Sequence, residues 1–359
     1  MAKIIVGMSG GVDSSVSSFL LKKMGYDVIA IFIKCWDECN FRKDYEDALL
    51  VCEQLKIPLY KIDFTEEYKE RVFKNFLEEY KKGNTPNPDI LCNKEIKFNL
   101  FLQKAEKLNA DFIATGHYAQ KRGNCLMKAR DLSKDQTYFL YTLKSDILKK
   151  VVFPIGHLKK EEVRKIAKES GLITSEKKDS TGICFIGKRD FRPFLKKYIA
   201  CKKGAIENLD GKIVGEHEGV FLYTIGQRKG LGIGGEGEAW FVVEKDVKNN
   251  VLIVAQGENH PALMYDSIVV SSLTWIPSKM PFFCKAKIRY RQKDQDCIIE
   301  KIEEGNAFIR FMTLQRAPTA GQSVVFYRGE HCLGGGIIIK TGKSLYFKEL
   351  TAIKNIRLY

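Results

Sequence analysis

The chain is long and basic. Its 359 residues suffice for two or three domains with a sizeable core, and a hydrophobic content of 45% is ordinary for a globular protein. A net charge of +15, from 59 Lys and Arg against 44 Asp and Glu, indicates a polyanionic partner or an anionic surface. We find no signal peptide and no apolar run long enough to cross a bilayer, so we expect a cytoplasmic protein without a membrane partner. Ten cysteines in that reducing compartment argue against a disulfide framework.

Short apolar runs alternate with amphipathic stretches along residues 1–203. This alternation predicts the α/β class, with a parallel sheet sandwiched by helices on both faces. The predicted strands span 4–8, 28–33, 59–62 and 111–115. The predicted helices span 13–24, 43–56, 65–82, 89–108 and 159–170.

The pattern changes near Lys203 to strands separated by Gly, Asn and Asp turns. We therefore divide the chain into domains at 1–203, 204–265 and 266–359, whose net charges are +12, −4 and +7. The second is predicted to be a small β-rich domain and the third a C-terminal β-barrel or sandwich. Strands of the third are expected at 268–270, 284–292, 307–312, 323–327 and 336–339. A polyanion that contacts the first and third domains would match this charge distribution.

A phosphate-binding turn is predicted where the first strand ends. Residues 9–15 read Ser-Gly-Gly-Val-Asp-Ser-Ser, directly after an apolar run and before the first helix. Two glycines let the backbone approach an anion, the first helical amides have no intrahelical acceptor, and Asp13, Ser14 or Ser15 can cap the turn. The turn lacks the Gly-Lys-Ser/Thr ending of a Walker loop, so transfer of the γ-phosphoryl group is not indicated. The alternative is a serine-rich helix cap without a ligand.

Two other patterns match known motifs without their structural context. The glycine cluster at 230–235 fits GxGxxG, but the residues after it read as a strand, whereas a dinucleotide fingerprint must open a helix. We therefore expect a loop there. Cys35 and Cys39 have no second Cys or His pair at a ligand spacing nearby, so we assign no metal site.

Two cysteines stand in settings that favour a reactive thiolate. Asn87 is the predicted N-cap and Pro88 the first residue of a helix, which puts Asp89 and Cys92 on one face near its positive end. That position lowers the pKa of a thiol. Cys184 lies in a loop-like stretch at 179–187, where preceding lysines favour a thiolate and two glycines allow movement. Taken singly, either cysteine also fits a role in the core.

The segment from Cys284 to Arg291 alternates strictly in polarity. A strand would place four basic side chains on one face and four less polar ones on the other. The basic set is Lys285, Lys287, Arg289 and Arg291. We interpret this face as one that follows the phosphates of an RNA; the alternative is an edge strand protected from aggregation by charge.

Eight motifs together resemble those of bacterial tRNA-specific 2-thiouridylases, members of the PP-loop ATP pyrophosphatase superfamily. They are SGGVDSS, TPNPDILCN, ATGHYA, KDQTYFL, DSTGICFIG, LYTIGQRKGLGIGG, KIRYRQ and QRAPTAGQSVVFY. The resemblance implies an adenine nucleotide α-hydrolase-like fold in the first domain. It also implies a tRNA-uridine 2-sulfurtransferase, which uses ATP to replace O2 of the wobble uridine, position 34, by sulfur in tRNAs for glutamate, glutamine and lysine.

The resemblance also implies residue roles. Cys92 would be the nucleophile and Cys184 the persulfide carrier, with Asp89 and Asp13 also catalytic. ATP, with Mg²⁺ neutralising the leaving group, would contact Gly7, Met8, Ser9, Gly10, Gly11, Val12, Asp13, Ser14, Ile33 and Gly116. The tRNA anticodon stem-loop would contact Asn87, Pro88, Asp89, His117, Lys134, Asp135, Gln136, Arg289, Tyr290 and Gln322. A cysteine desulfurase or a sulfur relay protein would supply the sulfur.

One segment departs from the family pattern. Where that pattern reads Phe-Met-Lys-Asn-Trp, this chain has Ile33 in place of Met and Cys35 in place of Asn. Ile33 keeps an apolar contact with adenine possible.

The chemistry of the implied reaction agrees with the cysteines. A pyrimidine C2 carbonyl has no leaving group, so adenylation of O2 must create one, AMP. A persulfide on Cys184 then attacks C2, or Cys92 reduces it and releases sulfide; either route ends in a Cys92–Cys184 disulfide. Asp89 would accept the uridine N3–H, act as an acid or base, or only cap its helix, and the base must leave its stack.

Two alternative functions remain at this stage. One is another PP-loop ATP pyrophosphatase, of the lysidine synthetase or amide ligase type, which needs no such pair of cysteines. The other is a non-catalytic RNA-binding protein that senses ATP. Release of pyrophosphate with and without unmodified tRNA separates an enzyme from a sensor.

Overall fold

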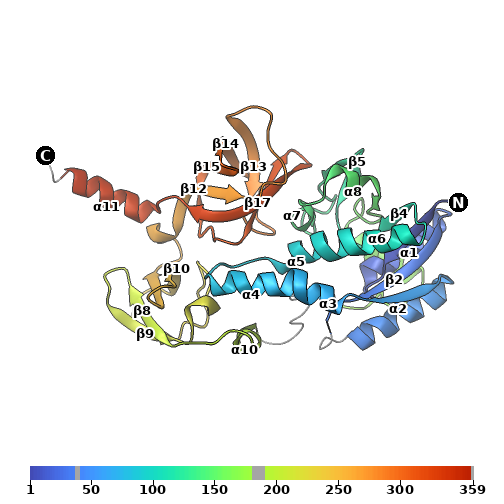
Figure 1. Ribbon diagram of the computed structural model, residues 1–359, viewed down its shortest axis with the longest axis horizontal. Helices are drawn as coiled ribbons and strands as arrows, with labels where there is room; N and C mark the ends of the chain where they lie inside the picture. Colours follow the sequence, from blue (N-terminus) through green and yellow to red (C-terminus); the bar gives the residue numbers. More distant parts are fainter. Residues whose placement is uncertain (37–40, 180–190, 357–359) are drawn as a thin grey trace. The chain divides into compact units, whose positions relative to one another are not determined.

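The computed structural model describes residues 1–36, 41–179 and 191–356, which form two compact units (Figure 1). Unit 1 comprises Met1–Asn75, Pro88–Arg189 and Tyr327–Leu333, and unit 2 comprises Phe76–Asn87, Asp190–Phe326 and Gly334–Tyr359. Cys39 and Cys184 lie outside the described residues.

Unit 1 is built on a five-stranded parallel sheet, as predicted. Its strands lie in the order β3-β2-β1-β4-β7, and all neighbouring pairs are parallel. They are β1 (Lys3–Gly7), β2 (Asp27–Lys34), β3 (Leu59–Asp63), β4 (Phe112–Ala114) and β7 (Val151–Val152). The sequence predicted the first four and missed β7, which has only two residues. The strand order reverses beside β1, where β2 lies on one side and β4 on the other.

Helices cover both faces of this sheet. Ile4, Val6 and Ala30 share one face and pack in a core with residues of α1, α2 and α9. A side chain at Gly7 would point to the opposite face and meet the ring of Phe101 at 3.7 Å, so α6 covers that face. The longer helices of unit 1 are α1 (Val12–Lys23), α2 (Phe41–Leu55), α6 (Phe101–Lys107) and α9 (Lys160–Glu169), whereas most of α4 (Lys74–Lys81) belongs to unit 2.

The predicted helices 65–82 and 89–108 each contain a π-helical segment. The first runs through α3 (Thr65–Tyr68), η1 (Lys69–Phe73) and α4, and the second through α5 (Pro88–Leu91), η2 (Cys92–Leu100) and α6. Two short helices, α7 (Thr137–Leu140) and α8 (Ser145–Lys149), and the hairpin β5 (Gln120–Arg122) and β6 (Cys125–Met127) complete the unit. Within the described part of the chain, no helix has the length and hydropathy needed to span a membrane.

Unit 2 contains a mixed four-stranded sheet in the order β10-β11-β8-β9. Its elements are α10 (Phe191–Lys196), β8 (Gly204–Asn208), β9 (Ile213–His217), η3 (Val220–Leu222), β10 (Trp240–Asp246) and β11 (Val251–Gln256). The glycine cluster 230–235 has no regular structure and is followed by β10, which confirms the predicted loop.

The remaining strands form the predicted C-terminal barrel, all antiparallel where their pairing is given. They run in the order β12-β15-β14-β13-β16-β17, and β12 pairs with β17 to close the circle. Their bounds, with the two helices that flank them, are η4 (Pro261–Leu263), β12 (Met264–Ser271), β13 (Phe282–Lys287), β14 (Gln295–Glu303), β15 (Asn306–Arg316), β16 (Ser323–Arg328), β17 (His331–Thr341) and α11 (Leu345–Ile356). The sequence analysis missed β14.

The prediction of a strand from Cys284 to Gln292 with one basic face is wrong. β13 ends at Lys287, and Arg291 has a φ of +64°, because residues 288–292 form a turn in which Gln292 Oε1 accepts the Ile288 N–H. Lys285 pairs with Asp296 at 2.9 Å, and the buried Lys287 lies 3.7 Å from Asp294. Alternating polarity persists through the turn, so polarity alone did not reveal where the strand ends.

Candidate nucleotide and thiol site

Three neighbouring parallel strands of unit 1 end beside residues that can carry chemistry. β1 leads into the 9–15 loop, β2 leads into Cys35, and β4 leads into Gly116 and His117. The carboxyl ends of parallel strands meet at one edge of a sheet, and ligands bind at that edge where the strand order reverses. The reversal lies between β1 and its two neighbours, so the loop occupies this position.

The loop depends on glycine at two positions. Gly10 has a φ of +71°, and a Cβ there would lie 2.1 Å from the carbonyl oxygen of Asp44. A Cβ on Gly116, in the chain after β4, would lie 2.8 Å from the amide nitrogen of Ser14. The segment after β4 therefore packs directly against the start of α1.

The start of α1 has no side-chain cap. Its N-cap residue is Gly11, and the hydroxyls of Ser14 and Ser15 instead donate to the Gly11 carbonyl at 3.0 and 2.8 Å. Ser14 Oγ also accepts the Ser9 N–H at 3.2 Å, which closes the turn. Ser14 thus caps the turn, as one of the three residues expected to do so, but no side chain caps the helix itself. Without such a cap, the first amides of α1 can bind an anion.

The Asp13 carboxylate binds two side chains that the sequence did not indicate. It accepts the Tyr118 hydroxyl at 2.8 Å and the Lys160 ammonium at 2.8 and 2.9 Å. Burial, and then the charge of Asp13, raise the pKa of Tyr118. Lys160 is only 8% exposed, at the first position of α9. A buried ammonium of this kind must be paired, and it lies beside the candidate phosphate site.

Asp179 is the second carboxylate on Lys160. The two groups lie 2.8 Å apart, and Arg164 and Lys134 bind the same carboxylate at 2.8 and 2.9 Å. Burial raises the pKa of Asp179, but the hydrogen bonds from Lys160 and Lys134 outweigh burial and hold the pKa at about 2. Asp13 and Asp179 thus both hold Lys160 in place.

Lys177 also stabilises the loop. Its ammonium donates to the Gly10 carbonyl at 2.9 Å and to Asp44 and Asp47 at 2.7 and 2.5 Å. We had expected the lysines of this segment to favour a thiolate at Cys184. Lys177 is paired with two carboxylates of α2, so its charge also serves the loop, and Cys184 itself lies outside the described residues.

A thiol with a lowered pKa lies where α5 passes into η2. Cys92 is 4% exposed; its hydrogen bond with Cys35 lowers its pKa, burial opposes this, and the charge of Lys97 lowers it further. The direction agrees with the prediction, and α5 begins at Pro88 as predicted. The cause differs, because Cys35 and Lys97 supply the effect that we had attributed to the helix end.

Lys97 acts on two further groups of this site. Burial raises the pKa of Asp89, and Lys97 opposes that rise. Burial and then Lys97 lower the pKa of His117 well below its usual value, so the imidazole is neutral at pH 7. We call Cys35, Asp89, Cys92, Lys97 and His117 the thiol cluster. Helical periodicity gave no signal for Lys97, which lies five residues after Cys92 in a π-helical segment.

Replacing Lys97 by Met should raise the pKa of Cys92 and slow its alkylation by iodoacetamide at pH 7 about tenfold. Lys97 lowers this pKa, so its loss moves the alkylation profile to higher pH. The measurement is the alkylation rate against pH, read at the Cys92 peptide by mass spectrometry. Lys97→Arg keeps the charge and should keep the profile, and Cys52, whose pKa burial raises to about 12, should stay unreactive. An unchanged profile in Lys97→Met would contradict this account.

The other predicted nucleotide contacts lie on or beside the sheet. Met8 and Val12 have buried side chains, so only their backbone groups can face a ligand. Gly7 packs on Phe101, and Ile33 is partly buried on β2.

Several predicted tRNA contacts in unit 1 are engaged in internal interactions. His117 is buried, and its Nδ1 lies 2.9 Å from Thr115 Oγ1. The buried Asp135 accepts the Ala129 N–H and the Thr137 hydroxyl. Gln136 accepts the Tyr118 N–H, and Lys134 pairs with Asp179.

Pro88 and Asp89 open α5 in unit 1, and the remaining predicted contacts belong to unit 2. Gln322 donates to the Thr85 carbonyl at 2.5 Å, just before Asn87. Arg289 donates to the Ala317 carbonyl at 2.6 Å, and the guanidinium of Arg291 lies 5.2 Å from the ring centre of Tyr290.

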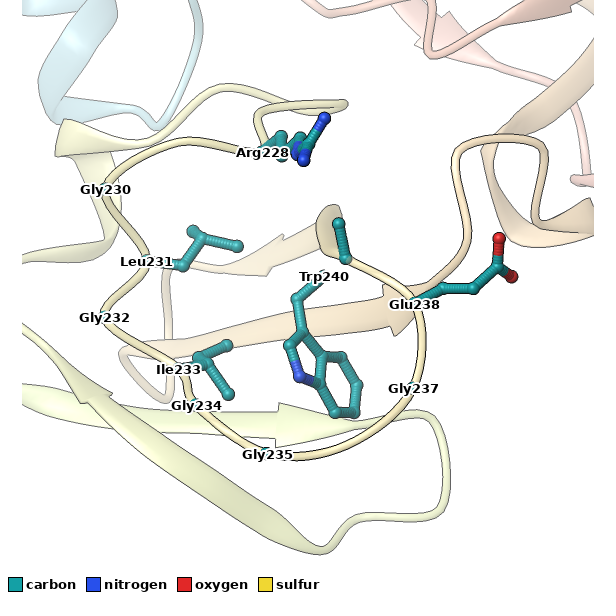
Figure 2. A pocket seen from close by; sticks show the side chains of 11 residues that line it. Arg228, Gly230, Leu231, Gly232, Ile233, Gly234, Gly235, Gly237, Glu238 and Trp240 are labelled. Carbon is teal, nitrogen blue, oxygen red and sulfur yellow. The ribbon is translucent and has the colours of Figure 1, made fainter.

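The glycine-rich loop of unit 2 encloses a cavity of about 310 Å³ (Figure 2). Leu231, Ile233 and Trp240 project into the loop, and Arg228 and Glu238 also line the cavity. The Arg192 guanidinium donates to the Gly230 carbonyl at 3.0 Å and braces the loop. None of the predicted site residues is among those that line this cavity.

Known families and proteins match nearly the whole chain. Residues 2–188 match the tRNA methyl transferase HUP domain, 192–256 the tRNA methyl transferase PRC-barrel domain, and 265–338 the aminomethyltransferase β-barrel domain. The tRNA-specific 2-thiouridylase MnmA of Protochlamydia amoebophila (strain UWE25) is 54% identical over 356 residues, which cover 96% of this chain and 95% of that protein. The tRNA-specific 2-thiouridylase MnmA of Shouchella clausii (strain KSM-K16) is 54% identical over 351 residues, 94% of this chain and 96% of that protein.

Proposed function

The chain belongs to the family of tRNA-specific 2-thiouridylases, and we propose that it replaces O2 of the wobble uridine by sulfur in tRNAs for glutamate, glutamine and lysine, in the cytoplasm. It is thus a sulfurtransferase that acts on tRNA and uses ATP. The observation that carries the finer proposal is Cys92, a thiol of lowered pKa whose partner Cys35 directly follows the strand beside the phosphate-binding loop. The matched domain descriptions speak of methyl transfer, but a reactive thiol suits sulfur transfer.

The first proposed step adenylates the uridine. ATP would bind Gly7–Ser14 and Gly116, with its phosphates on the first amides of α1. O2 attacks the α-phosphorus, the uridine N3–H passes to Asp89, and pyrophosphate leaves. Burial raises the pKa of Asp89, which makes its carboxylate a better proton acceptor.

Mg²⁺ would accompany the triphosphate. The phosphates would carry most of the coordination, with at most a carboxylate such as Asp13. Among the described residues, no group of three or more His, Cys, Asp or Glu could hold a metal ion. When bound, the ion would neutralise charge on the departing pyrophosphate.

The second proposed step transfers sulfur. In the direct route the terminal sulfur of a Cys184 persulfide attacks C2 and AMP leaves; the Cys92 thiolate then attacks Cys184 Sγ, which breaks the sulfur–sulfur bond and releases 2-thiouridine. In the other route Cys92 attacks Cys184 Sγ first, and the released sulfide displaces AMP from C2. Both routes leave a Cys92–Cys184 disulfide, which a thiol must reduce before the next turnover. A cysteine desulfurase or a relay protein would load the persulfide.

Product analysis tests this proposal. Unmodified tRNA is incubated with ATP and a sulfide source, the tRNA nucleosides are identified by mass spectrometry, and the nucleotide products are separated. We expect 2-thiouridine, AMP and pyrophosphate. ADP as the nucleotide product would contradict the adenylation step, and ATP turnover without thiolated tRNA would favour another PP-loop enzyme.

Arg291→Glu should weaken tRNA binding. It should also reduce the slope of log binding constant against log salt concentration by about the contribution of one phosphate contact. Arg291 is exposed and lies in the barrel segment with net positive charge. Arg289 is not suited to this test, because it hydrogen-bonds Ala317 and its reversal would also disturb the fold. The measurement is the dissociation constant of tRNA across a salt series. Lys248→Glu, at an exposed turn of the acidic 204–265 segment, is the matched control, and equal affinities of both variants would contradict the prediction.

A further inference from the structure

Two thiols face each other in the C-terminal barrel. Cys284 on β13 is the register partner of Cys297 on β14, and their Sγ atoms lie 3.7 Å apart. Both are free cysteines of unit 2. The proposed sulfur transfer uses neither of them, so the pair is available for a different reaction.

The backbone around this pair suits a disulfide. Opposed residues of two antiparallel strands place their side chains on the same face, with Cα atoms about 4.5–5.5 Å apart. A disulfide spans Cα distances of about 4.4–6.8 Å, so the two strands can keep their register. The Sγ atoms have to approach each other by about 1.7 Å to reach the usual S–S bond length.

The two thiols differ in access to solvent. Cys284 is partly exposed, whereas Cys297 is 2% exposed. The hydrogen bond with Cys284, and then burial, raise the pKa of Cys297 above its usual value, so Cys297 is a neutral thiol at pH 7. A reagent in solution therefore meets Cys284 first, and Cys297 reacts through Cys284.

We propose that Cys284 and Cys297 form a redox-modification site that reacts with small disulfides of the glutathione type. The Cys284 thiolate attacks one sulfur of glutathione disulfide; a Cys284–glutathione bond forms, and one glutathione leaves as a thiolate. Cys297 Sγ then attacks Cys284 Sγ and displaces the second glutathione as a thiolate. The contact between the two Sγ atoms makes this second step intramolecular.

The reaction is balanced and reversible. The cysteine pair loses two electrons, and glutathione disulfide gains them. The protons of the two cysteine thiols end on the two glutathione thiols. An excess of glutathione drives both steps backward, as expected for a disulfide with a partly exposed member in a reducing compartment.

The disulfide changes the local stability of the barrel. It joins β13 to β14 on either side of residues 285–296, which include the turn at 288–292. The link restricts the opened hairpin more than the closed one, so opening becomes less favourable. The stability of the segment that carries Arg289 and Tyr290, two predicted tRNA contacts, therefore follows the ratio of glutathione disulfide to glutathione.

Peptide mapping in a glutathione buffer tests the site. The full-length protein is incubated with glutathione disulfide, quenched with N-ethylmaleimide and digested without reductant. We expect a Cys284–Cys297 linked peptide that an excess of glutathione removes, while the exposed Cys125 and Cys201 carry glutathione. Glutathione that persists on Cys284 of wild type overturns the proposal. Alkylation of both barrel thiols in a sample whose Cys125 and Cys201 are modified also overturns it.

Single variants test the order of the two steps. Cys297→Ala should stop at the mixed disulfide on Cys284, and Cys284→Ser should leave Cys297 unmodified, because the buried thiol is reached through Cys284. Cys201→Ser, which removes an exposed thiol of the same unit, is the matched control and should form the linked peptide as wild type does. Glutathione on Cys297 of Cys284→Ser would overturn the assigned order.

Hydrogen exchange measures the effect on the barrel without tRNA or ATP, so it remains informative if the proposed function fails. Backbone amides of β13 and β14 should exchange severalfold more slowly in oxidised than in reduced wild type. In Cys284→Ser the same amides should exchange equally under both conditions. Equal exchange in the linked and reduced forms of wild type would overturn the proposed effect on stability.

Discussion

Replacement of Cys92 or Cys184 by Ala should abolish 2-thiouridine formation while tRNA binding and pyrophosphate release are retained. Adenylation needs ATP, the base and its positioning groups but no sulfur, so both variants can still form the adenylated uridine. Neither can complete sulfur transfer, because each lacks one half of the disulfide that the reaction leaves behind. The measurements are nucleoside mass spectrometry for the product and a pyrophosphate assay for the first step.

The Cys92→Ala and Cys184→Ala variants should differ in persulfide loading, which precedes the sulfur-transfer step that both lack. A protein without Cys184 cannot carry persulfide sulfur at that position, whereas a protein without Cys92 should load normally and then stall. Mapping of the persulfide after incubation with a sulfur donor distinguishes them. Full thiolation by Cys184→Ala would refute the assignment of the carrier.

Four other cysteines provide controls for these variants. Cys52 and Cys297 are buried and Cys125 and Cys201 are exposed. Replacing the exposed pair should change neither activity nor stability, and replacing the buried pair should cost some stability through lost packing. A loss of product in all four variants would indicate general damage instead of a catalytic role for any one thiol.

The sequence predicted the parts of the fold that have a strong local pattern. β1 and β2 are apolar runs followed by amphipathic helices, and periodicity finds such segments reliably. β14 was missed because charged and apolar residues mix along Gln295–Glu303, and β7 was missed because two residues carry no period. The Cys284–Gln292 error has another cause: alternating polarity continued beyond Lys287, where the backbone turns.

The site follows the same rule. The residues of the phosphate-binding loop follow one another in the chain, and so do those of the helix that carries Cys92. Each set was therefore found as one stretch of the sequence. Lys160 lies 147 positions from Asp13, and Lys177 lies 133 positions from Asp44. Such contacts arise only when helices α2 and α9 pack on the sheet, so no local pattern could indicate them.

Cys35 shows a third limit of sequence patterns. The sequence analysis assigned no metal site to Cys35 and Cys39, and the departure of Cys35 from the family pattern carried no chemical role there. In the fold Cys35 lowers the pKa of Cys92, because the chain returns to this edge of the sheet 57 residues later. A residue that departs from a family pattern is best judged by what it contacts.

Asp13→Asn should slow pyrophosphate release roughly a hundredfold and leave tRNA binding largely intact. The substitution keeps the size of the side chain and its contact with the Tyr118 hydroxyl but removes the charge that pairs with Lys160. Of the two residues that pair with the buried Lys160 ammonium, only Asp179 then remains a carboxylate. The Lys160 ammonium, which lies beside the phosphate site, therefore shifts toward Asp179. The measurement is single-turnover pyrophosphate release with saturating ATP and tRNA.

Lys160→Met distinguishes the charge of Asp13 from its contact with that lysine. If Asp13 acts by holding Lys160, Lys160→Met should slow pyrophosphate release by a similar factor. The double variant should then release pyrophosphate no more slowly than either single variant. Asp47→Asn, which removes a partner of Lys177 on the other side of the loop, controls for general disturbance of the loop. Additive losses in the double variant would mean that Asp13 and Lys160 act separately, with Asp13 contacting the nucleotide or its metal ion directly. An unchanged rate of pyrophosphate release in Asp13→Asn would mean that the contacts among Asp13, Lys160 and Asp179 only stabilise the packing of α1 and α9.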